Sequence, residues 1–185
     1  MKRKAFLKSV AGCGLCSCLG TGVVLAKANE ARDDGFSASK DCEWEKNFTQ
    51  KRFNWLLQLM EEELDTTEYN KIIRRLGVKC AESIENIAIE NKGNPEGYFN
   101  KVNSMWGEVF TYDREKQIVS LNTNLQKCPC PNVNMNITPE SYCDCSLGWQ
   151  KHMFEIVFGK PVEVRHIETI LRGGRTCRFE IRIKS

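Results

Sequence analysis

The residues of this sequence that could do the most chemistry are its cysteines. Ten are present, and five gather in the C-terminal third as two C-x-C pairs and one later residue: Cys128, Cys130, Cys143, Cys145 and Cys177. Thiolates that lie close in sequence can hold zinc, because their proximity lowers the entropy cost of assembling a tetrahedral site. In an oxidising compartment the same spacing suits a disulfide between the two pairs. The spacing leaves both interpretations open.

The position of Cys143 and Cys145 at the start of a predicted helix limits what they can share. Successive helical residues turn by about 100°, so these two side chains would point about 200° apart if both were fully helical. They could share one ion only if the helix began at or after Cys143. We therefore favour Cys143 with Cys177 as ligands, and Cys128 or Cys130 as a further one.

The other cysteines carry less information. Seven cysteines follow residue 28, and an odd number leaves one thiol over if pairing stays within the chain. Cys80 falls on the apolar stripe of a predicted helix, where we expect a plain buried cysteine. Cys42 indicates nothing specific.

His166 and Glu168 could complete a metal site. If Gly173-Gly174 forms a two-residue turn, both side chains lie on the same face of the last hairpin as Cys177. A histidine and a carboxylate on a buried face need a metal, a ligand or each other as partner. A shift of one residue in register would turn both toward water.

Apolar periodicity predicts that the first half of the chain is helical. Apolar residues recur at steps of three and four over 44–64 and again from a cap at Thr66 or Thr67 to a stop at Gly93. A shorter helix is expected over 95–106. We expect Leu57 and Ile73 to be buried.

The second half predicts an antiparallel sheet. Short β-prone runs at 108–112 and 117–121 form one hairpin, and 162–171 with 176–183 form another. A loop over 122–136 and a helix over 138–158 lie between them. In the last run Phe179 and its alternate neighbours face the core, and the charged residues face water. These elements predict an α+β domain, with N-terminal helices packed on a sheet of about four strands.

Residues 1–28 have the form of a cleavable export signal, with a basic head, an apolar middle and an Ala26-Lys27-Ala28 exit. The head resembles a twin-arginine signal, although Lys4 stands in place of the second arginine. A lipid anchor at Cys13 is the alternative. We expect a flexible tether over 29–40, a single domain over 41–185, and a periplasmic or extracellular location.

Charge and hydropathy exclude some partners. The formal charge is +3, but removing the five basic residues of 1–28 changes it to −2. This balance argues against a nucleic-acid partner. No later stretch approaches the roughly 20 apolar residues of a membrane span.

The last 45 or so residues contain a series of spaced motifs. Cys143 and Gly148 lie on one predicted helix, Gly159-Lys160-Pro161-Val162-Glu163-Val164 leads into a strand, and Glu168 precedes Gly173-Gly174-Arg175-Thr176-Cys177-Arg178-Phe179. This series resembles the closing part of 4-vinyl reductase domains. The resemblance implies an α+β fold around an apolar pocket for small molecules.

In sensor members of that family, cysteines and a glutamate form a zinc site. The resemblance matches Cys143 and Cys177 to two of the cysteines, and His166 or Glu168 to the glutamate. One cysteine of the family pattern is missing, and Cys145 could replace it. The implied zinc set is therefore Cys143, Cys145, Cys177 and one of His166 or Glu168.

The function that we expect from these patterns is binding of a small apolar or aromatic ligand by an exported domain, which could also form a homodimer. The cysteines would act as a structural metal or disulfide clamp. The sequence contains no G-x-S-x-G, H-E-x-x-H or Gly-rich phosphate loop, so no catalytic residue is assigned. A cysteine-based redox or metal-dependent enzyme of the cell envelope is the alternative, and an envelope interaction protein is a third possibility.

Overall fold

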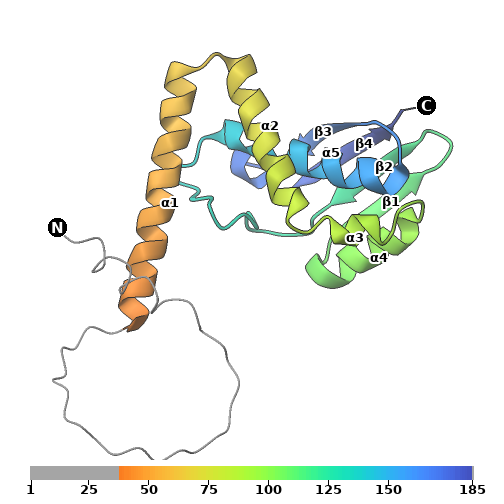
Figure 1. The fold of residues 1–185 in the computed structure, drawn as a ribbon, viewed down its shortest axis with the longest axis horizontal. Coiled ribbons are helices and arrows are strands. Elements are labelled where there is room, and N and C mark those ends of the chain that lie inside the picture. The colour runs from red at the N-terminus through yellow and green to blue at the C-terminus, as the bar shows by residue number, and fades with distance from the viewer. Residues whose placement is uncertain (1–37, 185) are drawn as a thin grey trace, which may run out of the picture. The chain divides into compact units, whose positions relative to one another are not determined.

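The computed structural model describes residues 38–184, with side chains from residue 43. The predicted signal segment and most of the predicted tether lie outside the described residues. Within 38–184 the chain forms five α-helices, two short 3-10 helices and four strands (Figure 1). No helix in this part of the chain is both long enough and apolar enough to cross a membrane.

Four helices occupy the first half, as predicted. They are α1 (Ala38–Glu63), α2 (Thr66–Glu82), α3 (Asn86–Ile89) and α4 (Pro95–Trp106). Asp65, rather than either threonine, caps α2 by accepting hydrogen bonds from the backbone of Thr67 and Glu68. The prediction of a single helix up to Gly93 is wrong, because a turn separates α2 from α3. Ser83 Oγ donates to the Cys80 carbonyl at 2.6 Å there, a local bond that competes with helix continuation.

The sheet is fully antiparallel, which confirms the predicted α+β class. Its strands β1 (Val109–Asp113), β2 (Ile118–Asn122), β3 (Val162–Glu168) and β4 (Arg178–Ile183) lie in the order β1-β2-β4-β3. In β4, Phe179, Ile181 and Ile183 are buried while the residues between them face outward. The predicted alternation of this strand is therefore confirmed.

The predicted two-residue turn between β3 and β4 is wrong. The chain instead forms the 3-10 helix η2 (Ile170–Arg172), which buries Ile170 and Leu171. A register irregularity follows His166, so that His166 pairs with Phe179 and Glu168 pairs with Arg178. His166 and Glu168 consequently do not share a face: the ring of His166 lies against Phe179, while Glu168 binds Arg178.

The helix predicted over 138–158 starts as the 3-10 helix η1 (Glu140–Cys143) and continues as α5 (Asp144–Phe158). Helix α5 packs on the sheet and beside α2 (Figure 1). A Cβ atom at Gly148 would lie 1.9 Å from the Arg74 carbonyl oxygen, and one at Gly77 would lie 1.8 Å from the Cys145 carbonyl oxygen. Only glycine permits this backbone approach, so these two glycines set the α2–α5 crossing.

Two apolar clusters hold the elements together. The larger lies between α4, α5 and the sheet, and we call its ring-bearing part the aromatic core: Tyr98, Phe99, Phe110, Phe154 and Phe158. The smaller joins α1, α2, η1 and η2 through Leu57, Tyr69, Ile73, Tyr142 and Leu171. The expected burial of Leu57, Ile73 and Phe179 is confirmed.

Candidate functional site

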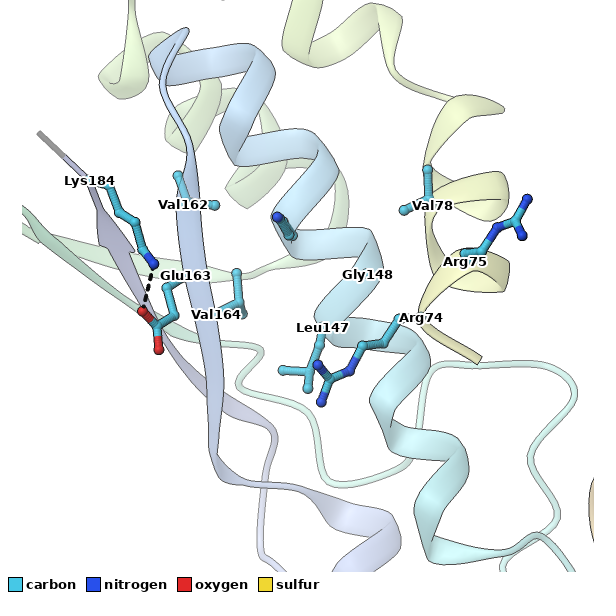
Figure 2. Close-up of a pocket in the computed structure, with 10 residues that line it drawn as sticks. Arg74, Arg75, Val78, Leu147, Gly148, Val162, Glu163, Val164 and Lys184 are labelled. Atoms are coloured by element: carbon cyan, nitrogen blue, oxygen red, sulfur yellow. Dashed lines mark ion pairs between the residues drawn. The ribbon is translucent and has the colours of Figure 1, made fainter. Parts of the chain in front are cut away.

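A groove lies where α2, α5 and β3 meet. Its volume is about 330 Å³, within the range of small-molecule sites. Four aliphatic side chains form its apolar lining: Val78, Leu147, Val162 and Val164. Figure 2 shows Leu147 extending from α5 toward β3. The tight α2–α5 crossing positions these walls, because Gly148 itself lines the groove.

Basic side chains surround this apolar lining. The groove residues include Arg74, Arg75, Lys151 and Lys184, against the single acid Glu163. Lys184 pairs with Glu163 at 3.1 Å, as the dashed line in Figure 2 marks. The guanidinium of Arg74 points toward β3, whereas that of Arg75 points away from it (Figure 2). A ligand with an apolar body and an anionic end matches this arrangement.

Asp144 anchors Arg74, one of the residues that line the groove. It is the first residue of α5 and is 7% exposed. Arg74 Nη2 donates to its Oδ2 at 3.0 Å, and Arg172 Nη2 donates to its Oδ1 at 2.9 Å. Burial alone would raise the pKa of Asp144, but the hydrogen bonds from the two arginines outweigh it and leave the pKa below its ordinary value. The carboxylate is therefore charged near neutral pH and holds both arginines in place.

His166 extends this network from β3. Arg172 Nη1 lies 3.1 Å from its Nδ1, and Ser146 Oγ lies 3.0 Å from its Nε2. Burial, reinforced by the charge of Arg172, lowers the pKa of His166 to about 4. The imidazole is thus neutral at pH 7. Because a guanidinium can only donate, Nδ1 accepts and the proton resides on Nε2.

Ser146, His166 and Asp144 have the residue types of a hydrolytic triad, but their hydrogen bonds run the wrong way. Ser146 Oγ donates to the Cys143 carbonyl at 2.6 Å, so it accepts from His166 Nε2. A general base would need a free lone pair on that nitrogen. Asp144 Oδ1 is 3.8 Å from Nδ1, beyond hydrogen-bond distance. The network positions side chains and does not activate Ser146.

The predicted zinc ligands do not converge on one point. Cys143 Sγ donates to Thr169 Oγ1 at 3.3 Å, and Cys177 Sγ accepts from the Ile170 N–H at 3.5 Å. Glu168 binds Arg178 and the Arg175 backbone. In residues 38–184 no three histidine, cysteine or acidic side chains converge as a metal site would require. Zinc therefore remains a prediction from the resemblance.

The thiols form two neighbouring sets that overlap, because Cys130 lies close to members of both. Cys128 lies near Cys143 and Cys177: burial raises the pKa of Cys128 to about 11, and its cysteine neighbours add to the shift. Cys145 turns instead toward Cys80 and Cys130, and burial with those two thiols raises its pKa to about 12. Cys143 also acts on Cys145, but less strongly than Cys80 and Cys130 do.

Sequence patterns did not predict several of the site residues. Cys80, expected to be buried, is exposed. Arg74, Asp144 and Arg172 lie far apart in sequence, and no motif connects them. The glycines at 77 and 148 were the available signal, because a glycine inside a helix indicates a close backbone approach.

Comparison with known proteins places this geometry in context. No curated protein matches the sequence. The phenol-responsive sensory domain of the transcription activator PoxR, solved with phenol, is similar in structure over 72% of this chain and 74% of its own, with a TM-score of 0.51 and 10% identity. A trafficking protein particle complex subunit 3 from Naegleria fowleri, covalently bound to palmitic acid, matches 77% of this chain and 97% of its own, with a TM-score of 0.49 and 13% identity. The model of a family of unknown function, DUF6144, matches residues 23–185, and the chain therefore belongs to this family.

Proposed function

We propose that this domain is a small-molecule-binding module whose groove holds an aromatic or aliphatic ligand with an anionic group. The observation that carries the proposal is an aliphatic lining with a surplus of cations around it. Apolar walls with a few placed polar groups are the usual composition of ligand sites. The ordered Asp144 network adds a second support, because it fixes Arg74 at the edge of the groove.

The fold supports a binding role. The sensory domain of PoxR, solved with phenol, has a similar fold. The resemblance of the C-terminal motifs to 4-vinyl reductase domains points the same way, since those domains surround a small-molecule pocket. The proposal differs from our initial expectation in one respect: the basic rim favours an acid over a neutral apolar molecule.

The dimensions of the groove limit the ligand. About 330 Å³ corresponds to roughly ten water-sized volumes, which suits one aromatic ring with a short substituent. The groove is open on one side, so part of the ligand stays in water. For a ligand of this size we expect a Kd on the order of 10⁻⁴ M.

Isothermal titration calorimetry with 4-ethylbenzoate and the neutral 4-ethylbenzamide tests the proposal. We expect the carboxylate to bind about tenfold more tightly than the amide at low ionic strength, with the difference shrinking as salt increases. Equal binding of both probes, or binding of neither at millimolar concentration, would contradict the proposal.

Lys151→Gln provides the site-specific test, and Lys79→Gln is its matched control. Both lysines are exposed and pair with a glutamate on their own helix, but only Lys151 lines the groove. We expect Lys151→Gln to weaken 4-ethylbenzoate binding about three- to fivefold, in line with the loss of one partly exposed charge. Lys79→Gln should bind as the unchanged protein does. Equal effects of the two variants would indicate a general charge effect rather than a site.

A further inference from the structure

Two cysteines from different helices meet at the α2–α5 crossing. Cys80 lies in the last turn of α2, and Cys145 is the second residue of α5. The two thiols are close enough for each to affect the pKa of the other. They are 65 positions apart in the sequence, so the fold alone brings them together.

The backbones of α2 and α5 approach each other closely beside this pair. The Cys145 carbonyl oxygen would lie 1.8 Å from a Cβ atom at Gly77, and Cys80 is three residues, or just under one helical turn, further along α2. Disulfide-bonded cysteines usually have their Cα atoms about 4.4–6.8 Å apart. Packed helices reach that separation only where their backbones nearly touch, as they do here.

The two thiols differ in access. Cys80 is exposed, and Cys145 is half-buried against the smaller apolar cluster. Cys130, from the loop before η1, is the third thiol of this set, and its Sγ lies 3.6 Å from Tyr142 Oη. An oxidant from solvent can therefore reach Cys80 first, and Cys145 is the thiol placed behind it.

We propose that Cys80 and Cys145 form an oxidisable pair whose substrate is a small disulfide such as oxidised glutathione. The Cys80 thiolate attacks one sulfur of the small disulfide, which breaks its S–S bond, forms a mixed disulfide and releases one thiolate. The Cys145 thiolate then attacks the Cys80 sulfur, forms the Cys80–Cys145 bond and releases the second thiolate. The two protein thiols are oxidised, the small disulfide is reduced to two thiols, and the two protons pass to them.

The new bond would join α2 to α5 beside the ligand groove. Since the loop that it closes is long, the link restricts the unfolded chain strongly. It makes the two helices that form the groove inseparable in the oxidised state. This inference is independent of the proposed ligand, because the Cys80 and Cys145 side chains do not line the groove.

The test treats the full chain with oxidised glutathione at pH 8.5, where thiolates are more abundant. Remaining thiols are then blocked, and the digest is analysed by mass spectrometry. We expect a Cys80–Cys145 cross-linked peptide and a melting temperature raised by roughly 5–15 °C, which dithiothreitol reverses. A glutathione adduct that persists on Cys80, or Cys145 joined to Cys130 instead, would overturn the proposal.

Cysteine-to-serine variants test whether this pair, and not another pair of thiols, forms the cross-link. Cys80→Ser changes an exposed side chain, so it should fold normally and lose both the cross-link and the rise in melting temperature. Cys143→Ser is the matched control, because Cys143 belongs to the other thiol set and hydrogen-bonds Thr169. It should keep both effects. Retention of the rise in melting temperature by Cys80→Ser would also contradict the proposal.

Discussion

Two carboxylates in different parts of the domain experience opposite environments. Asp144 lies at the groove end between two arginines, and their hydrogen bonds lower its pKa despite burial. Glu108 lies near Tyr98 at the aromatic end, where burial raises its pKa to about 7. In the part of the chain that the structure describes, Glu108 has no ion pair that would offset this shift.

The comparison distinguishes a tightly packed part of the molecule, which stabilises the fold, from the part that forms the groove. At the aromatic end, stacked and tilted rings such as Phe99 and Phe110 fill the space between α4, α5 and the sheet. At the groove end, a backbone crossing, charged hydrogen bonds and ten lining residues surround an open space. Substitutions at the two ends should therefore differ in kind.

Gly148→Ala should have the largest effect. Its Cβ would lie 1.9 Å from the Arg74 carbonyl oxygen, so α5 would have to move away from α2. We expect a loss of about 4 kcal/mol or more in the free energy of unfolding, measured by urea denaturation. A loss below about 1 kcal/mol would mean that the crossing is looser than described.

Phe154→Ala tests the opposite end. Phe154 is fully buried and packs against four other rings of the aromatic core. We expect a loss of about 3–4 kcal/mol with 4-ethylbenzoate binding preserved wherever the protein remains folded. A selective loss of binding in folded protein would move the ligand site to the aromatic end.

Asp144→Asn should destabilise the protein by about 2 kcal/mol, because it leaves Arg74 and Arg172 without their shared anion. We also expect weaker binding of 4-ethylbenzoate, since Arg74 loses its anchor. Chemical denaturation at pH 7 and calorimetry measure the two effects. An unchanged stability would show that the arginines do not depend on this carboxylate.

Glu108→Gln should raise the free energy of unfolding, whereas the substitutions above lower it. The folded-state pKa of about 7 exceeds the usual value of about 4.3, so ionising Glu108 costs stability as the pH rises through this interval. The amide removes that cost, and we expect a gain of about 1–2 kcal/mol at pH 8 and almost none at pH 4.5. A loss at pH 8 would show that a charged Glu108 has a stabilising partner.

His166→Gln should produce the smallest effect, visible as a pH dependence. The pKa of His166 is lowered to about 4 in the folded protein from about 6.5 when unfolded. The unfolded state therefore binds more protons between these values, and this contribution to stability is lost as the pH falls from 6.5 toward 4. We expect His166→Gln to reduce the difference in unfolding free energy between pH 7 and pH 5 by about 1 kcal/mol.

His152→Gln is the control for this measurement, because His152 lies on α5 away from the Asp144 network and pairs with Glu85. It should retain the acid-dependent loss. If His166→Gln loses as much unfolding free energy between pH 7 and pH 5 as the unchanged protein does, the pH dependence comes from other groups.

Local patterns in the sequence were sufficient to predict most of the fold. Period-two alternation identified the buried face of β4, and the Pro95 start correctly placed α4. The errors came where tertiary contacts or side-chain bonds override the pattern. Ser83 ends α2 early, and burial of Ile170 and Leu171 replaces a simple turn by η2.

The site was less predictable for a physical reason. Arg74, Asp144, His166 and Arg172 become neighbours only after α2, α5 and β3 pack. Periodicity reports which face of an element is apolar, but it does not report which charged residue meets another across a crossing. Cys80 illustrates the limit: its place on an apolar stripe predicted burial, yet its side chain is exposed.

The most direct test of the account is a methyl NMR titration of the leucine- and valine-labelled protein with 4-ethylbenzoate. The predicted result is saturable shifts of the methyl groups that line the groove, those of Val78, Leu147, Val162 and Val164. Buried methyl groups toward the aromatic end, those of Val102, Val119 and Val157, should remain unchanged. Shifts confined to these latter residues, or no saturable shift at any of the seven, would contradict ligand binding in the groove.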